Sequence, residues 1–188
     1  MTRLMDQHLI AIDLDGTTLN NRSKLTAETI NTLRSAAKDG HIVSIITGRP
    51  YRIAQHIYDQ IGIQTPMVNF NGALTHIPHQ NWDKEYEIEL TKELALDLLA
   101  HRDELGIDTI TVESKDHFWA NQATKDVPEF LPNRLKPSQL LSKRNLSDNP
   151  IAMTIEYQPG SKKKIIQAVN EKYGDFVEPR VWGGPYNI

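Results

Sequence analysis

The first eighty residues alternate between two hydrophobic periods, and this alternation restricts the fold more than any other feature. Apolar runs of strand length occupy residues 9–14, 41–48 and 67–77. Between them, apolar residues recur at helical spacing over 26–40 and 51–62, and both stretches end at a glycine, Gly40 and Gly62. Strand, helix, strand, helix and strand in this order predict βαβ units, with a parallel sheet and right-handed crossovers.

The pattern changes after about Pro78, where a second block begins. Amphipathic helices are predicted over 91–106 and 161–174. Short strands are predicted over 85–90, 108–114, 116–122, 151–157 and 175–182. Residues 125–150 contain four prolines and few apolar anchors, which indicates a long irregular connection. This block is typical of an α+β arrangement with antiparallel hairpins and helices on one face.

The change of pattern divides the chain into two predicted domains. Residues 1–80 are expected to form an α/β domain and residues 81–188 an α+β domain, with the boundary near residues 78–84. The chain is 39% hydrophobic and 24% charged, which is an ordinary globular composition. We therefore expect both domains to bury a core.

Composition and charge exclude several classes of function. The chain has no cysteine, so disulfides, thiolate metal sites and a cysteine nucleophile are excluded. The net charge of -3 gives no electrostatic reason to expect a nucleic acid or an anionic membrane as the main partner. The N-terminus is too short and too charged for a signal peptide, and no apolar run approaches the length of a membrane span. We expect a soluble, cytoplasmic protein.

Polar residues follow each of the first three predicted strands. In an open parallel sheet, ligands bind outside the carboxyl ends of the strands, so these residues are expected to line one pocket. The pocket would combine carboxylates, a hydroxyl, a guanidinium group and backbone amides that glycine leaves accessible. The residues are Asp13 and Asp15 after the first strand, Thr47, Gly48 and Arg49 after the second, and Asn69, Asn71 and Gly72 after the third.

The two aspartates favour a divalent cation. Two carboxylates this close repel each other unless a cation lies between them or one is protonated, and Mg²⁺ suits a site with few protein oxygens. Because the chain turns at Asp15-Gly16, one ligand could be the Asp13 side chain and the other the Asp15 backbone carbonyl. The Asp15 carboxylate would then be available as an acid. The amides after Thr47 are placed to face a phosphate.

Simpler interpretations of the same residues stay open. Asp15-Gly16 could be a turn, with Asp13 a solvated strand end. Thr47 could serve only as the N-cap of the following helix. The pair Asn71-Gly72 is explained by a hairpin alone, and Arg49 could simply pair with a core carboxylate. The seven histidines lack ligand spacing, so none is predicted to bind metal.

Three motifs together give the sequence a family resemblance. The stretches "IAIDLDGTTLN", "SIITGRP" and "NFNGA", in this order and spacing, resemble the haloacid dehalogenase-like (HAD) phosphohydrolases, and in particular their Cof-type subfamily. The resemblance implies a Rossmann-like core, a parallel sheet with helices on both faces, into which a large cap is inserted after the third strand. It would make residues 1–80 the N-terminal part of that core and residues 81–188 the cap.

The resemblance also implies a role for each matching residue. Asp13 would attack the phosphoryl group and bind Mg²⁺, while Asp15 would be the general acid and then the base, its backbone carbonyl the second metal ligand. The Thr47 hydroxyl would bind a phosphoryl oxygen, and Arg49 would face the substrate at the pocket mouth. Gly48 would let the backbone approach the phosphoryl group. The other residues expected to bind substrate or phosphate are Leu14, Asn71 and Gly72. The partner would be a small phosphorylated metabolite, either a sugar phosphate or a phosphorylated cofactor.

Two elements of the family pattern are absent from these 188 residues. They are a lysine at the start of a later core helix and an acidic GDxxND-type segment that completes the metal site; Asp148 lies in the wrong context for the latter. We therefore expect weak Mg²⁺ binding, an exposed apolar sheet edge, and a chain that is a fragment of a longer phosphatase. The alternatives are a catalytically incompetent remnant or binding protein with the same pocket, and a phosphosugar mutase.

Overall fold

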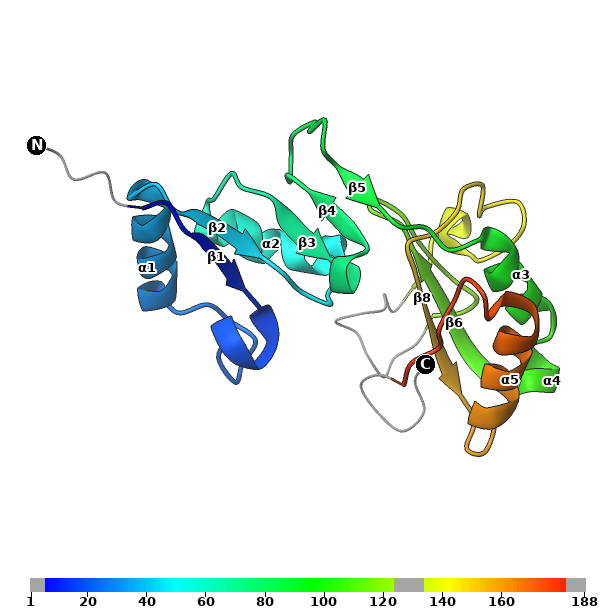
Figure 1. The fold of residues 1–188 in the computed structure, drawn as a ribbon. Helices are drawn as coiled ribbons and strands as arrows, with labels where there is room; N and C mark the ends of the chain where they lie inside the picture. The colour runs from blue at the N-terminus through cyan, green and yellow to red at the C-terminus, as the bar shows by residue number, and fades with distance from the viewer. Residues whose placement is uncertain (1–5, 124–133, 182–188) are drawn as a thin grey trace, which may run out of the picture. The chain divides into compact units, whose positions relative to one another are not determined.

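The computed structural model describes residues 6–123 and 134–181 (Figure 1). The chain divides into two compact units, Met1–Ile88 and Glu89–Ile188. We describe each unit by itself. No helix in the described part of the chain has the length and apolar character needed to cross a membrane.

The first unit contains the predicted parallel strands. Strand β1 (Leu9–Ile12) pairs in parallel with β2 (Ile42–Ile45) over its whole length. Strand β3 (Met67–Asn69) continues the same order, because Ile46 forms a parallel bridge with Val68. The carboxyl ends of the three strands therefore lie at one edge, as the order of strands and helices predicted.

Two helices make the crossovers between these strands. Helix α1 (Ala27–Lys38) begins after Thr26, whose hydroxyl accepts a hydrogen bond from the backbone N–H three residues later, at 3.1 Å. Helix α2 (Tyr51–Ile61) ends at Gly62, which adopts the left-handed conformation with φ 74°. Arg34 of α1 donates to two carbonyl oxygens in the last turn of α2, both at 2.9 Å. This contact fixes the two helices against each other.

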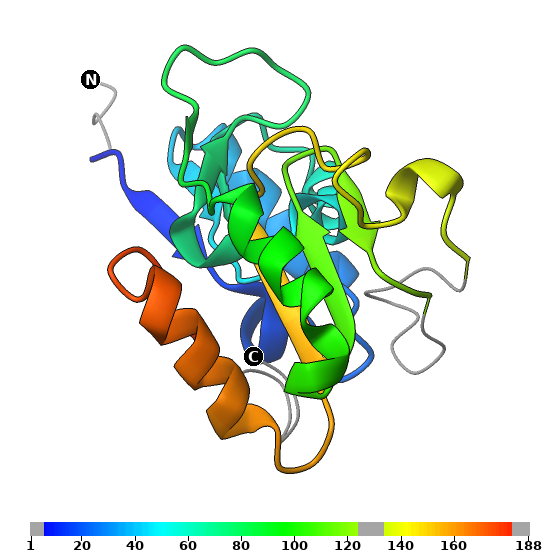
Figure 2. The ribbon, with the colours of Figure 1, turned by 90° about the vertical axis from the view of Figure 1, so that its right-hand side faces the viewer.

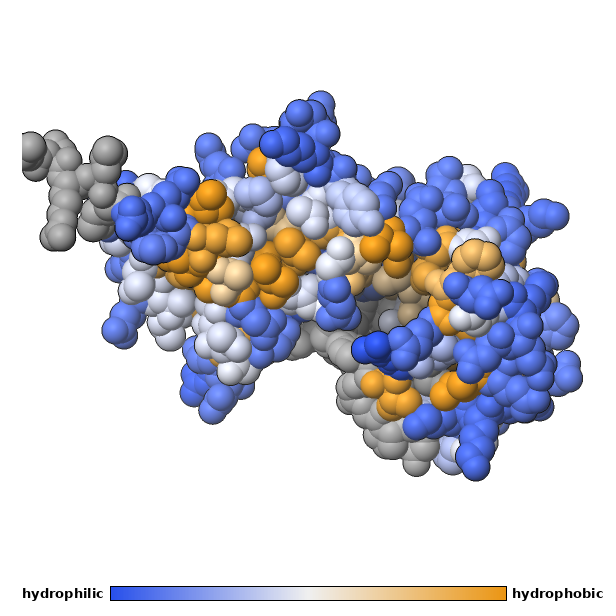
Figure 3. Space-filling view, viewed as in Figure 1, coloured by the Kyte–Doolittle hydropathy of each residue, from blue (hydrophilic) through white to orange (hydrophobic). Residues whose placement is uncertain are grey.

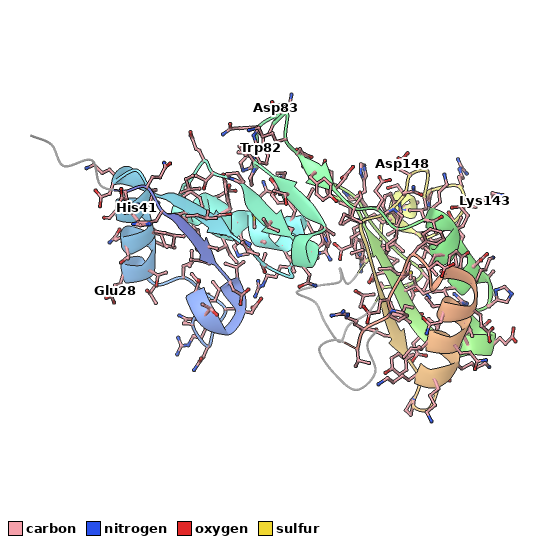
Figure 4. All side chains as sticks on the ribbon, in the orientation of Figure 1. Glu28, His41, Trp82, Asp83, Lys143 and Asp148 are labelled. Atoms are coloured by element: carbon pink, nitrogen blue, oxygen red, sulfur yellow. The ribbon has the colours of Figure 1, made fainter. Side chains whose placement is uncertain are left out.

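A hairpin follows β3 and contributes the rest of the first unit. Strand β4 (Leu74–His76) is antiparallel to β3, which confirms the hairpin predicted from Asn71-Gly72. The strand expected over 85–90 is shorter than predicted. It is reduced to β5 (Tyr86–Glu87), which pairs with β4 inside the first unit. Figure 4 shows Trp82 and Asp83 on the loop between β4 and β5.

The first unit exposes apolar surface along its parallel strands. Leu9 on β1 is 66% exposed, and Ile46, just after β2, is 41% exposed. In the described residues, β1 pairs with β2 alone, so its other edge carries no strand partner. Figure 3 shows hydrophobic atoms gathered on this unit. An open edge beside apolar side chains matches the exposed edge that the sequence predicted.

The second unit is a three-stranded antiparallel sheet with helices against it. The central strand β6 (Ile107–Glu113) pairs with β7 (Phe118–Ala120) on one side and with β8 (Ala152–Tyr157) on the other. Helices α3 (Lys92–Ala100) and α5 (Lys162–Tyr173) lie on the same side of this sheet (Figures 1 and 2). Their apolar residues and those of β6 and β8 form one core. The α+β character predicted for this block is present.

Two expectations for the second unit need correction. The single helix predicted over 91–106 is broken at His101, so that α3 is followed by the short helix α4 (Arg102–Leu105). The strand predicted over 175–182 is absent from its described part, residues 175–181. There the chain turns back, with Val177 N–H bonded to the Tyr173 carbonyl at 3.0 Å, and Pro179 has no N–H to offer a sheet.

The long connection before β8 is described only in part. Residues 124–133 lie outside the described residues, and residues 134–150 contain a single 3-10 turn, η3 (Pro137–Gln139). The irregular character predicted for 125–150 holds over the described portion. Proline content explains it, because each proline removes a backbone donor and fixes φ.

Candidate active site

The turn after β1 presents Asp13 to solvent. Residues Leu14–Thr18 form one tight turn, closed by a hydrogen bond from Leu19 N–H to the Leu14 carbonyl at 2.9 Å. Gly16 takes φ 71° in this turn, a conformation that glycine adopts without steric cost. The Thr18 hydroxyl donates to the Asp13 carbonyl, and the Thr17 hydroxyl lies 3.5 Å from the Asp13 carboxylate. The Asp13 carboxylate is thus held only loosely by its own turn.

Leu14 anchors this turn in the core. Its side chain is fully buried, with no exposed surface. Leu14 therefore could contact a phosphate only through its backbone, and its side chain serves packing. The sequence motif could not distinguish these roles, because an apolar residue between two aspartates fits both.

The loop after β2 turns its carbonyl groups toward the hairpin. Thr47 N–H bonds to the Val68 carbonyl at 2.9 Å, and the Thr47 carbonyl accepts from Asn71 N–H at 3.3 Å. The Thr47 hydroxyl accepts from Arg49 N–H at 3.1 Å. No described residue accepts a hydrogen bond from that hydroxyl, and the Gly48 N–H makes no hydrogen bond within the described part of the chain. Both groups are donors that a phosphate oxygen could use.

Thr47 does not cap the following helix. Helix α2 begins at Tyr51, and its N-cap position is Pro50, which provides no side-chain cap. The interpretation of Thr47 as a plain N-cap is therefore wrong. Its buried position, 3% exposed, reflects the hydrogen bonds within its own loop.

Arg49 joins the β2 loop to the β1 turn. Its guanidinium donates twice to the Asp15 carboxylate, Nε to Oδ2 at 2.8 Å and Nη2 to Oδ1 at 2.6 Å. The Arg49 side chain is 13% exposed and the Asp15 side chain 58% exposed. Arg49 thus pairs with a carboxylate, but this carboxylate is an exposed predicted site residue and not the core carboxylate of the simpler interpretation. Two parallel bonds fix orientation as well as distance.

This ion pair stabilises the ionised form of Asp15. Hydrogen bonds from the Arg49 guanidinium, reinforced by its charge, hold the pKa of Asp15 below its ordinary value, although partial burial opposes them. Asp15 would be ionised at neutral pH even without Arg49, and the pair makes this carboxylate harder to protonate. The ionised form is the state required of a base, whereas proton donation requires the carboxyl group to gain a proton first.

Gly48 lies directly against the hairpin tip. A Cβ atom at this position would come within 2.7 Å of Asn71 Oδ1. Asn71 itself adopts the left-handed conformation with φ 56°, which asparagine tolerates better than most residues. A Cβ atom added to the next residue, Gly72, would meet no atom within 4 Å. The structure therefore brings Asn71 to the β2 loop but gives Gly72 only a conformational role, at φ 106°.

The oxygen donors beside β1 fit a magnesium ion. Asp13 offers an exposed carboxylate, and Asp15 offers its backbone carbonyl while its carboxylate is engaged by Arg49. Hard cations of this kind bind oxygen ligands. In the described ranges no three histidine, aspartate or glutamate side chains gather as a metal site. The donors present fit an ion held by one carboxylate, one carbonyl and water.

Two buried residues lie behind this loop. Asn69 was expected to line the pocket but is shielded from solvent, and His76 was not assigned a role from the sequence. Asn69 and His76 are both completely buried, and they hydrogen-bond to each other through Asn69 Oδ1 and His76 Nε2 at 3.1 Å. Asn69 also donates from Nδ2 to the Arg49 carbonyl at 3.0 Å. A polar residue in each of two short apolar strands was the available signal, since buried polar groups need partners.

A side chain at Gly48 is expected to disturb the site more than the fold. Gly48→Ala would push the Asn71 amide away, but this exposed side chain can rotate, so we expect the melting temperature to change little. Phosphate binding or turnover in the full-length protein should fall by about tenfold or more, because the new methyl group lies beside the Gly48 N–H. Thermal melts and phosphate-release kinetics test this. Ser35→Thr, on the exposed face of α1, controls for an added methyl group. A large loss of stability with unchanged kinetics would contradict the prediction.

The fold and site define an α/β protein with paired carboxylates and phosphate-type donors at the ends of parallel strands. The sequence model of the haloacid dehalogenase-like hydrolases matches residues 10–186, and the chain belongs to this family. This confirms the resemblance found in the three motifs, and with it a hydrolase of the phosphatase type by family.

Known proteins of this family are similar over most of the chain. The chain is 26% identical over 182 residues to 5-amino-6-(5-phospho-D-ribitylamino)uracil phosphatase YitU of Bacillus subtilis, covering 96% of this chain and 67% of that protein. Its structure resembles TM0651 from Thermotoga maritima, with TM-score 0.75, 17% identity and coverage of 97% and 68%. It also resembles the HAD subclass IIB sugar phosphatase BT4131, with TM-score 0.63, 20% identity and coverage of 87% and 64%.

These similarities bear on fold and on length. The predicted fold class, a Rossmann-like core with an α+β part, is confirmed by the similarity to solved HAD structures. The chain spans about two thirds of the length of each of these relatives, namely 67%, 68% and 64%.

Proposed function

We propose that the full-length protein hydrolyses small phosphomonoesters through an aspartyl-phosphate on Asp13. One observation carries the proposal: the Arg49–Asp15 ion pair joins the carboxylate turn after β1 to the donor loop after β2. A phosphoryl group beside Asp13 would then lie near both elements. Family membership supports the same reaction class.

Asp13 is the nucleophile in this proposal. A carboxylate oxygen attacks phosphorus, the bond from phosphorus to the alcohol oxygen breaks, and the phosphoryl group is left on Asp13. Water then attacks phosphorus, the bond from phosphorus to the Asp13 oxygen breaks, and inorganic phosphate leaves the restored carboxylate. An ionised carboxylate needs no base for the first step, and the exposed position of Asp13 leaves it accessible to substrate.

The donors of the β2 loop stabilise the phosphoryl oxygens. The Thr47 hydroxyl and the Gly48 N–H would bind them as charge builds up on these atoms. Asp15 would take the proton of the attacking water, and its pairing with Arg49 fixes the orientation of the carboxylate. Protonation of the leaving alcohol would require Asp15 to receive a proton before the first step.

Magnesium belongs to the same proposal. The Asp13 carboxylate and the Asp15 carbonyl would hold the ion, which would neutralise phosphoryl charge. Two protein ligands should give weak affinity in this chain, since charge and ligand number determine how tightly the ion is held.

The substrate is proposed to be a small phosphorylated metabolite, either a sugar phosphate or a phosphorylated cofactor. The relative YitU is named as a phosphatase of 5-amino-6-(5-phospho-D-ribitylamino)uracil, and the structural neighbour BT4131 as a sugar phosphatase. We further propose that residues 81–188 are the cap and that the protein acts in the cytoplasm. Residues 1–80 would then be the N-terminal part of the core.

A phosphate-release assay on the full-length protein tests the proposal. We expect turnover of sugar phosphates or pyridoxal-type phosphates that stops with EDTA and returns with Mg²⁺. Product analysis separates a hydrolase, which gives free phosphate, from a mutase, which moves phosphate to another hydroxyl. A protein that binds phosphomonoesters without turning over any of them would instead be a binding protein with the same pocket.

A further inference from the structure

A buried polar pair lies behind the loop that carries Thr47, Gly48 and Arg49. His76 on β4 and Asn69 at the end of β3 are both completely shielded from solvent. His76 Nε2 lies 3.1 Å from Asn69 Oδ1. Burying two such side chains in an apolar hairpin is costly unless their polar atoms find partners, so the pair needs an explanation.

The hydrogen bonds of Asn69 determine which ring nitrogen of His76 carries a proton. The Arg49 carbonyl can only accept, so the Asn69 atom 3.0 Å from it must be the amide nitrogen. The amide oxygen of Asn69 therefore faces His76 and must accept a hydrogen bond from Nε2–H. The imidazole is consequently in the form with hydrogen on Nε2.

His76 also contacts the other end of the loop. Its ring meets the ring of Tyr51 edge to face, with centroids 4.5 Å apart and an interplanar angle of 85°. Tyr51 is the first residue of α2 and is buried. The imidazole thus reaches the Arg49 backbone through Asn69 and the start of α2 directly. His76 thus restrains the Arg49–Pro50 segment at both of its ends.

We propose that His76 is a positioning residue, which through Asn69 and Tyr51 fixes the Arg49 backbone so that the guanidinium meets Asp15 and the Thr47–Gly48 donors face the phosphoryl group. The inference rests on the proposed function for its catalytic consequence, whereas the hydrogen-bond chain itself does not. His76 touches neither substrate nor metal in this scheme.

The backbone contacts of the hairpin explain why this support is needed. Phe70 N–H reaches the Arg49 carbonyl only at 3.4 Å, near the limit of a hydrogen bond, whereas the Asn69 amide is at 3.0 Å. The shorter bond is the firmer restraint on that carbonyl. Replacing His76 with an apolar residue would leave Asn69 Oδ1 buried without a donor, and Asn69 would be free to turn away from Arg49.

Nitrogen NMR on the wild-type protein tests the first half of the inference. We expect the ¹⁵N shifts of His76 to identify protonated Nε2, with a proton that exchanges slowly because the ring is buried. A ring protonated only on Nδ1 would overturn the inference. This measurement needs neither a variant nor catalytic activity.

Kinetics of the full-length protein test the second half. His76→Leu is expected to lower kcat by about tenfold or more with a smaller change in KM, because the donors are displaced in the transition state. His76→Gln, which can still donate to Asn69, should recover part of the loss. His79→Gln is the matched control. His79 is exposed, and its Nε2 lies 2.8 Å from Asp59 Oδ1, so it takes no part in the hydrogen bonds of His76 and Asn69. The control should leave kcat unchanged.

The outcomes separate this inference from the proposed function. Wild-type kcat retained in His76→Leu would overturn the positioning role. Equal losses in His76→Leu and His76→Gln would overturn it too, since packing alone would then explain them. If the wild-type protein shows no turnover, the proposed function fails. The inference is then decided by the Arg49–Asp15 contact, which we expect His76→Leu to lose. The NMR resonance of the Arg49 Nε–H monitors this contact. An unchanged resonance would overturn the inference.

Discussion

Replacing Asp13 with asparagine should reduce phosphate release by the full-length protein by roughly 10⁴-fold or more. Asparagine has nearly the same shape, but its amide oxygen is a poor nucleophile and carries no charge to attract a cation. The turn after β1 should survive, because its hydrogen bonds use the Asp13 carbonyl and the Leu14 carbonyl. The melting temperature should therefore change little.

Steady-state phosphate release and mass spectrometry of the enzyme test this prediction together. The wild type, quenched during turnover, should carry one phosphoryl group on the peptide that contains Asp13, and the variant should carry none. Asp39→Asn, an exposed aspartate at the C-terminal end of α1, is the control for the loss of one charge. Turnover of Asp13→Asn at near wild-type rate would eliminate Asp13 as the nucleophile.

Asp15→Asn should slow turnover by roughly 10²–10⁴-fold for alkyl phosphates, the range expected when a proton-transfer group is lost. With p-nitrophenyl phosphate the first step needs no acid, so release of the phenol should stay fast. Hydrolysis of the aspartyl-phosphate would still lack its base. We therefore expect a burst of one phenol per enzyme followed by slow turnover.

Stopped-flow absorbance measures the burst, and Arg49→Gln is the informative companion variant. It removes the ion pair with Asp15 but keeps the carboxylate, so its loss in turnover should be smaller than that of Asp15→Asn. Equal slowing of alkyl and nitrophenyl substrates without a burst would contradict the assignment of Asp15 as acid and base. A common loss in both variants would indicate that the ion pair matters only for structure.

The main chain of the first unit could be predicted because its signals are local. The Thr26 cap, the left-handed Gly62 and the hairpin at Asn71 each follow from the chemistry of a few neighbouring residues. The strand predicted over 175–182, which is absent from the described residues 175–181, shows the limit of this reasoning. A local pattern predicted it, but a strand requires a neighbour, and a local pattern contains no information about one.

The candidate site was predicted less completely than the fold. The motifs placed Asp13, Asp15, Thr47 and Arg49 at the strand ends, yet the pairing of Arg49 with Asp15 was not predicted. The pair spans 34 residues of sequence, and long-range contacts of this kind depend on how the elements pack. The contact also lowers the pKa of Asp15, a shift that the sequence could not predict.

The sequence by itself determined which chemical groups stand at the ends of the parallel strands, because strand order and side-chain type are written along the chain. It also determined the family, through motifs whose spacing matches. Only the tertiary structure decided how these groups meet: Arg49 with Asp15, Gly48 with Asn71, and His76 with Asn69. Contact and burial control hydrogen bonding and charge, and both arise when distant segments pack together.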